Sequence, residues 1–221
     1  MFFYRWLSKL ENRFSRFSIR NLMTYIVAGM AMVFVADLFI GAATGRSLYS
    51  YFMFSAQAFL SGQFWRIITF IFLPPDSSLL FIVFSLYFYY LIGSSLEREW
   101  GSFWFNVYYL FGMIGTLIAG FISGAATNYY LNMSLFFAFA VMYPDFQLLL
   151  FFFIPIKIKW LALLDAAMFL LSFIIGSWPE RAAILASLIN FLIFFGPSFY
   201  RSLRDRYDTY KRRKRFRDGF Q

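Results

Sequence analysis

The chain has 221 residues, of which 61% are hydrophobic, 25% aromatic and only 14% charged, with a formal net charge of +9. Soluble domains rarely exceed about half apolar residues, so this composition excludes a soluble globular protein and predicts one that crosses a membrane several times. Histidine and cysteine are both absent, which excludes a disulfide framework, a thiol nucleophile, a Ser–His dyad and a zinc site of Cys and His ligands.

The N-terminal segment, residues 1–21, combines aromatic side chains with cations. Four of these cations recur at helical spacing opposite an apolar stripe. This pattern predicts an amphipathic helix that lies on the cytoplasmic leaflet and contacts anionic lipid headgroups. A cleavable signal peptide is not expected, because no small-residue cleavage site follows a short apolar core. The cations are Arg5, Lys9, Arg13 and Arg16, and the stripe contains Phe3, Leu7, Leu10, Phe14 and Phe17.

Six apolar segments follow, and we predict that each crosses the bilayer as a helix, for which about 17–25 residues are needed. They form one membrane domain over residues 22–198, before a basic tail at 199–221. The fourth segment is the weakest, because a Pro-Asp pair interrupts it, so five or seven spans are alternatives. The stretch Pro144–Lys159 is expected to be a re-entrant or interfacial connection. The predicted spans are Leu22–Ala43, Leu79–Leu96, Phe103–Ser123, Tyr130–Tyr143, Trp160–Gly176 and Arg181–Pro197.

The distribution of lysine and arginine predicts the orientation. With six spans, 17 of these cations lie on one side of the membrane and 3 on the other. Both termini are therefore expected in the cytoplasm, and the number of spans is expected to be even. Because the positive charge flanks the membrane, we expect it to contact anionic headgroups, and we do not expect nucleic-acid binding.

The third predicted span carries a row of small residues at i, i+4 spacing. Small rows let helix backbones approach closely in lipid, so we expect an intramolecular packing face and not a homodimer seam. The sixth span repeats the pattern with Ala182, Ala186 and Asn190. Both helices are expected to pack on the central helix of a compact bundle. The row of the third span is Gly112, Thr116, Gly120 and Gly124.

Two carboxylates, Asp37 and Asp165, fall inside predicted spans on different helices. An acid inside the membrane is a functional hypothesis by default. Two separated acids make a weak metal or proton-relay site, however, so we expect hydration or pairing with a neighbour such as Arg181 or Lys159. No metal and no cofactor is expected. A Ser–Lys nucleophile is not expected either, since Lys157 and Lys159 have the character of interfacial anchors.

Several motifs occur in the order in which they occur in the rhomboid superfamily. Residues 63–66, Gln-Phe-Trp-Arg, resemble the Trp-Arg loop after the first rhomboid span. Residues 93–97, Gly-Ser-Ser-Leu-Glu, resemble the end of the second span, and residues 154–160 are similar to the Ile-Pro-x-Lys-x-Lys-Trp element of many bacterial members. The resemblance covers residues 22–197. It implies an all-α membrane protein with a rhomboid-like bundle of six transmembrane helices.

The resemblance also implies a position for the Trp-Arg loop, with its motif residues Gln63, Trp65 and Arg66. In this family the loop after the first span lies half-sunk in the outer leaflet. Trp65 and Arg66 would then lie at headgroup depth, where an indole ring is favoured and a guanidinium contacts phosphate oxygens.

The catalytic residues of the family are missing. The Gly-x-Ser-Gly nucleophile turn is replaced by the sequence around Ser134, which lacks both glycines. Ser187 takes the place of the histidine in the sixth span. Ser85, Phe81 and Asp76 take the positions of the oxyanion-stabilising asparagine and of two further histidines. The resemblance therefore implies a rhomboid pseudoprotease, within the class that includes inactive rhomboids and the derlins.

We therefore expect a non-catalytic protein that binds transmembrane helices of client membrane proteins, in quality control or trafficking. The client would enter between the second and fifth spans, beside aromatic faces. One alternative is a rhomboid intramembrane serine protease. A second is a small transporter, which would need polar groups that converge at the middle of the membrane, and Ser85, Ser187 and Asn190 are few for that role. The compact chain and residues 154–160 favour a bacterial plasma membrane. The aromatic faces contain Phe81, Phe84, Phe88, Phe169 and Phe173.

Overall fold

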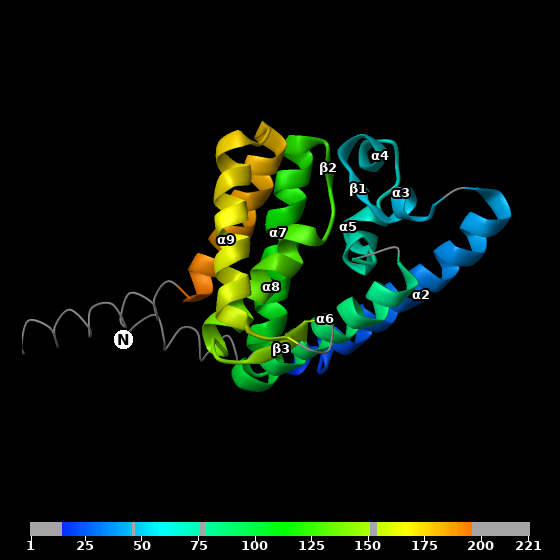
Figure 1. Cartoon of the computed structure of the whole chain (residues 1–221). Helices are drawn as coiled ribbons and strands as arrows, with labels where there is room; N and C mark the ends of the chain where they lie inside the picture. The colour runs from blue at the N-terminus through cyan, green and yellow to red at the C-terminus, as the bar shows by residue number, and fades with distance from the viewer. Residues whose placement is uncertain (1–14, 46, 76–77, 151–153, 196–221) are drawn as a thin grey trace, which may run out of the picture.

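The computed structural model describes residues 15–45, 47–75, 78–150 and 154–195. This part of the chain is mostly helical, with two short two-stranded ribbons (Figure 1). Most of the predicted amphipathic helix, the basic tail and Asp76 lie outside the described residues. The elements are η1 Ser15–Phe17, α2 Leu22–Thr44, α3 Tyr49–Phe52, β1 Phe54–Ser55, α4 Ala56–Leu60, α5 Arg66–Thr69, η2 Phe70–Phe72, α6 Leu79–Trp100, α7 Ser102–Ser123, β2 Ala125–Ala126, α8 Tyr129–Met142, β3 Gln147–Leu150, β4 Ile154–Lys157, α9 Ile158–Ile175 and a last helix, Trp178–Phe195.

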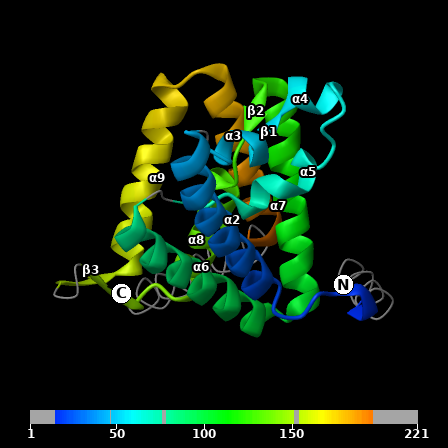
Figure 2. The same cartoon turned by 90° about the vertical axis from the view of Figure 1, so that its right-hand side faces the viewer.

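The helices α2 and α6 lie side by side and run obliquely to α7, α8, α9 and the 178–195 helix (Figures 1 and 2). Glycines permit the close approach of this oblique pair. A Cβ atom on Gly93 of α6 would overlap the Met23 side chain of α2, and one on Gly29 would overlap the ring of Phe72. The helix α2 ends at Gly45, whose positive φ of 66° favours glycine.

A buried carboxylate joins one end of the oblique pair to α7. Glu97 accepts hydrogen bonds from the Asn21 backbone N–H at 2.7 Å and from the Ser102 hydroxyl at 2.6 Å. Asn21 precedes α2 and Ser102 begins α7, so the Leu-Glu motif at the end of α6 holds the starts of two other helices. The side chain of Asn106 adds a bond to the Ile19 carbonyl at 2.9 Å.

The helix α8 lies at the centre of the bundle. Eight of its 14 residues are buried, whereas α9 buries only Ile158 and Phe169. A helix of 14 residues is about 21 Å long, which is less than the roughly 30 Å hydrocarbon core. The predicted fourth span is thus present as a helix, short and enclosed by protein.

Four described helices are long and apolar enough to cross a membrane, namely α2, α7, α9 and the 178–195 helix. The prediction of an all-α membrane protein is therefore supported, whereas six spans are not confirmed. The helix α6, with 22 residues, and the shorter α8 occupy the positions of the second and fourth predicted spans.

The segment between α2 and α6 folds into the angle between α2 and α7 (Figure 1). Its strand β1 pairs antiparallel with β2, with Phe54 opposite Ala126 and Ser55 opposite Ala125. The Asn128 side chain, just after β2, donates to the carbonyls of Ile71 and Leu73 at 3.1 and 2.9 Å. Segments more than fifty residues apart are therefore joined by backbone and side-chain hydrogen bonds.

The connection Pro144–Lys159 contains a β-hairpin, in which Gln147 lies opposite Lys157 and Leu150 opposite Ile154. Two paired strands leave their outer N–H and C=O groups without ladder partners, which is unfavourable in hydrocarbon. Of the two predicted alternatives, a re-entrant and an interfacial connection, the hairpin favours the interfacial one.

Candidate functional site

A small polar cluster lies in the core between α7, α8 and the 178–195 helix. The Tyr108 hydroxyl donates to the Ser134 carbonyl at 3.0 Å, and the Ser134 hydroxyl donates to the Leu131 carbonyl at 2.8 Å. The Asn190 amide nitrogen lies 3.5 Å from Ser134 Oγ. Ser187, one turn earlier, donates to the Tyr130 carbonyl at 2.9 Å. Ser134 and the sixth-span polar residues are thus brought together.

This cluster lacks the features of a hydrolytic site. Ser134 is fully buried, and its proton is directed to a helix carbonyl. The adjacent side chain is an amide, which cannot act as a general base. Of the other positions that match lost catalytic groups, Phe81 is exposed on α6, Ser85 is half-buried on the same helix, and Asp76 lies outside the described residues.

Arg66 holds the segment between α2 and α6 together. Its guanidinium donates to Gln63 Oε1 at 2.7 Å and to the backbone carbonyls of Ser50 at 2.7 Å and Met53 at 2.6 Å. The side chain is only 6% exposed, whereas Trp65 is 55% exposed. Nε and Nη1 of Arg66 therefore have partners in the protein, and contact of its guanidinium with headgroup phosphates stays a prediction. For Trp65, headgroup depth stays a prediction.

The small-residue row of α7 faces other parts of the same chain. A Cβ atom on Gly112 would overlap Leu131 of α8 and lie 2.9 Å from Asn190 Nδ2, and one on Gly120 would lie 2.7 Å from the Phe54 ring. Thr116 is buried and donates to the Gly112 carbonyl at 2.8 Å. Gly124 ends the helix with a φ of 89°. The row therefore contacts α8, β1 and the last helix.

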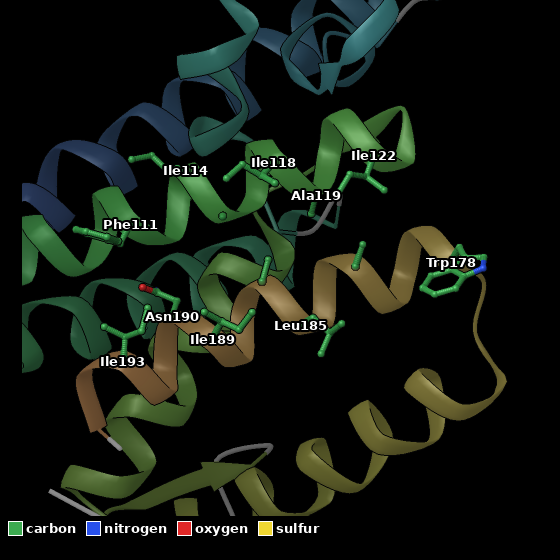
Figure 3. Close-up of a pocket in the computed structure, with 13 residues that line it drawn as sticks. Phe111, Ile114, Ile118, Ala119, Ile122, Trp178, Leu185, Ile189, Asn190 and Ile193 are labelled. Atoms are coloured by element: carbon green, nitrogen blue, oxygen red, sulfur yellow. The ribbon is translucent and has the colours of Figure 1, made fainter. Parts of the chain in front are cut away.

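An apolar groove of about 580 Å³ runs between α7 and the 178–195 helix (Figure 3). Its floor contains the small residues Gly115, Ala119, Ala182 and Ala186 together with Asn190. Its walls are large, exposed side chains: Phe111, Ile114, Ile118, Ile122, Trp178, Leu185, Ile189 and Ile193. Sequence reasoning identified the row Ala182, Ala186 and Asn190 as a packing face and missed the groove.

The aromatic faces that were expected to receive a client are only partly exposed. Phe81 and Phe84 on α6 are exposed. Phe169 on α9 is buried against Tyr130 and Phe137, and its role at an entry face stays a prediction. Phe88 packs at 6.0 Å from Phe136.

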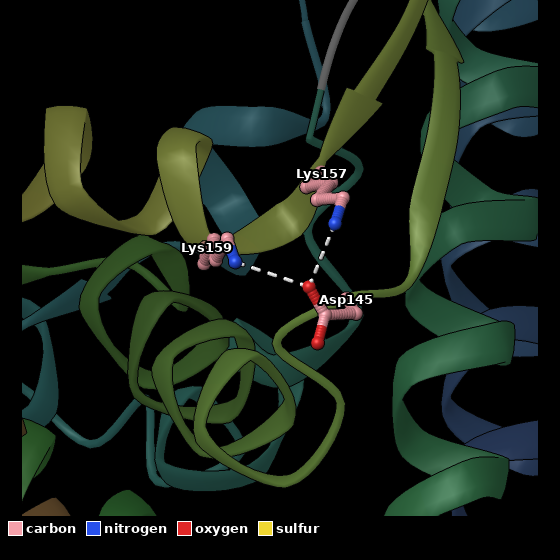
Figure 4. A network of polar contacts seen from close by, with 3 residues as sticks. All are labelled: Asp145, Lys157 and Lys159. Carbon is pink, nitrogen blue, oxygen red and sulfur yellow. Dashed lines mark hydrogen bonds and ion pairs between the residues drawn. The ribbon is translucent and has the colours of Figure 1, made fainter.

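The β-hairpin carries a charged cluster at its base (Figure 4). One carboxylate oxygen of Asp145 lies 3.0 Å from Lys157 Nζ and 3.0 Å from Lys159 Nζ. Hydrogen bonds and charge from Lys157, and then from Lys159, lower the pKa of Asp145 below its ordinary value. All three side chains are exposed. The two lysines, predicted as interfacial anchors, thus also fix the hairpin to the end of α8.

The two predicted intramembrane acids both lie among the described residues. Asp37 accepts hydrogen bonds from the Leu48 N–H at 2.5 Å and from the Ser47 hydroxyl at 3.0 Å, and so caps the chain after α2. Asp165 is half-buried on α9. Within the described ranges, no group of three or more His, Cys, Asp and Glu side chains is placed to hold a metal ion.

Residues 20–221 match the family model described as "Eukaryotic integral membrane protein (DUF1751)". A comparison with curated proteins gives no match. The predicted bacterial plasma membrane is wrong, because the family is eukaryotic; the element at 154–160, on which it depended, is not specific to bacteria. The match covers most of the chain and agrees with its several membrane-spanning helices. The chain therefore belongs to this family of eukaryotic integral membrane proteins.

Proposed function

We propose that this protein is a non-catalytic, rhomboid-like membrane protein that binds transmembrane helices of client proteins, in quality control or trafficking. The groove between α7 and the 178–195 helix carries the proposal. Membrane helices associate where small residues let backbones approach, because burial of apolar surface gives no drive in lipid. This groove presents such a floor between walls of large, exposed apolar side chains.

The groove has the length of a helix-binding surface. Along α7 it extends from Phe111 to Ile122, and along the last helix from Trp178 to Ile193. At 1.5 Å per residue these stretches are about 17 and 22 Å long, which is more than half of the roughly 30 Å hydrocarbon core. A helix in the groove would therefore be contacted over several turns.

The polar cluster supports the non-catalytic part of the proposal. An intramembrane serine protease needs a base beside its serine, and the whole chain contains no histidine. The side chain next to Ser134 is an amide. These residues instead contribute hydrogen bonds between helices in the core.

Crosslinking in a defined membrane tests the proposal. The protein, with a photoreactive residue at Ile118, is reconstituted in phosphatidylcholine vesicles. A leucine-rich helix of about 20 residues is added, with alanine at every fourth position so that its backbone can approach the groove floor. We expect a crosslink from Ile118 and none above background from Val83, which is exposed on α6 outside the groove.

A matched pair of variants tests whether the groove itself is responsible. Ala182→Leu narrows the groove floor and should reduce the crosslink from Ile118. Ala166→Leu adds the same side chain on the exposed face of α9 and should leave the crosslink unchanged. Equal crosslinking from Ile118 and Val83, or a full crosslink in Ala182→Leu, would contradict helix binding in this groove.

A further inference from the structure

Asn190 is the polar residue in the floor of the groove. Its side chain is 3% exposed and points from its helix toward α7 (Figure 3). Its amide oxygen is buried and accepts no hydrogen bond from the described residues. Buried polar atoms of native proteins nearly always have a partner, and hydrocarbon supplies no water to replace one. The unpaired oxygen is therefore a feature that requires an explanation.

The orientation of the amide follows from its neighbour. The nitrogen and oxygen of an asparagine side chain are distinguished by their hydrogen bonds. Ser134 donates its only hydroxyl proton to the Leu131 carbonyl, so it accepts from Asn190 and does not donate to it. The nitrogen of Asn190 therefore faces Ser134, and the oxygen is the atom without a donor.

Three hydroxyl groups of the neighbouring helices already donate to backbone carbonyls. The Thr116 hydroxyl donates to the Gly112 carbonyl, the Tyr108 hydroxyl to the Ser134 carbonyl and the Ser187 hydroxyl to the Tyr130 carbonyl. The other residues that line the groove have apolar side chains, apart from the indole of Trp178 at its far end. None of the described side chains that line the groove donates to the Asn190 oxygen, and an occupant of the groove can supply the donor.

The depth of Asn190 identifies the kind of occupant. Its amide lies against Gly112, which is ten residues into α7. At 1.5 Å per residue this position is about 15 Å from the helix start, near the middle of a roughly 30 Å hydrocarbon core. The polar groups of phospholipids lie at the surface, and their acyl chains carry no donor. A transmembrane helix can place a hydroxyl or amide donor at this depth.

We infer that the groove selects transmembrane helices that carry a serine, threonine, asparagine or glutamine side chain at the depth of Asn190, which accepts its hydrogen bond. This inference rests on the proposed function and names the class of client. Hydrogen bonds between membrane helices have modest strength, which corresponds to a preference of roughly three- to tenfold over an apolar helix.

Two peptides measure this preference. Both are the leucine-rich helix of about 20 residues described above, and they differ only in serine or alanine at the central position. Binding to the protein in phosphatidylcholine vesicles is followed by energy transfer between labels. We expect the serine peptide to bind roughly three- to tenfold more tightly to the unsubstituted protein. In Asn190→Leu, which has no acceptor, the ratio of the two affinities should fall to about one.

Ser187→Ala is the control. It removes the hydrogen bond to the Tyr130 carbonyl one turn earlier on the same helix and keeps the contact between Ser134 and Asn190, so the serine preference should persist. Equal binding of both peptides to the unsubstituted protein would overturn this inference and leave the proposed function intact. Binding of neither peptide would overturn the proposed function as well. A photoreactive phospholipid that crosslinks to Ile118 and is not displaced by either peptide would show that lipid fills the groove, and would overturn both.

Discussion

Replacement of Arg66 with alanine removes three donors from the segment between α2 and α6. Two of them bind the carbonyls of Ser50 and Met53, and the third binds Gln63 Oε1. Hydrogen bonds to charged groups contribute about 1.5–3 kcal/mol each, so the two carbonyl contacts correspond to about 3–6 kcal/mol. Water can reach the half-exposed segment in the variant, so we expect a loss near the lower end, about 3 kcal/mol.

This loss should open the 49–72 segment locally and leave the helices inserted in the membrane. Limited proteolysis of the reconstituted protein measures it, because cleavage within the segment follows its local opening. A loss of about 3 kcal/mol corresponds to a cleavage rate more than a hundredfold higher. Arg66→Lys should give an intermediate cleavage rate, because one ammonium group does not reproduce the planar set of N–H donors of a guanidinium. Cleavage of Arg66→Ala at the wild-type rate, or equal acceleration by Arg98→Ala on the exposed end of α6, would refute this reasoning.

Four further predictions concern packing, pH, topology and activity. Gly93→Ala should destabilise the protein by about 1–3 kcal/mol in thermal unfolding, because the added methyl group overlaps Met23. Gly41→Ala, which adds a methyl group in open space on α2, should stabilise the protein by about 0.5–1 kcal/mol. The opposite order of stabilities would contradict the α2–α6 contact. Lys157 and Lys159 lower the pKa of Asp145 in the folded protein. The stability that this ion pairing contributes is therefore fully present above the pKa of Asp145 in the unfolded chain, about 3.9, and is lost as the pH falls through the lower pKa of the folded state. The protection of the β3–β4 amides against hydrogen exchange, relative to the intrinsic exchange rate at each pH, should therefore fall only in acid, and Asp145→Asn should remove this dependence. Reporter fusions at Ser55 and Gln221 should give opposite compartments, and matching signals would contradict an even number of spans. The purified protein should not cleave model rhomboid substrates; cleavage that disappears in Ser134→Ala would show hydrolytic activity.

The positions of the long helices could be predicted from the sequence. The span predicted at Phe103–Ser123 is found at Ser102–Ser123, and the one predicted at Trp160–Gly176 at Ile158–Ile175. These segments are predominantly apolar and lie next to glycine or charged residues, so their composition is enough to locate them. Packing between α7 and α8 was also predictable in kind, because rows of small residues have few other uses in lipid.

The hairpin and the partners of Arg66 could not be predicted. In the run from Leu148 to Ile156 every residue is apolar, and periodicity cannot distinguish a helix from a buried strand in such a run. Two acceptors of Arg66 are backbone carbonyls 13 and 16 residues earlier in the chain. No regular pattern of residues in this segment indicates which carbonyls Arg66 contacts. The walls of the groove have the same isoleucine and leucine pattern as a lipid-facing surface. Only the juxtaposition of α7 with the 178–195 helix turns that pattern into a groove.

The segment between α2 and α6 has a consequence for the membrane around the protein. Arg66 and Asn128 satisfy four of its backbone carbonyls, and β1 pairs with β2, so much of its polar backbone needs no water. Its outer surface presents Leu60, Phe64, Trp65 and Ile68, which are 55–80% exposed. Lipid chains beside this segment contact an apolar surface that is shorter than the surface of a transmembrane helix. Bilayers adapt to a short apolar surface by thinning. We therefore expect the bilayer to be thinner on this side of α7 than elsewhere around the protein, so that lipids around the chain differ in height from one face to another.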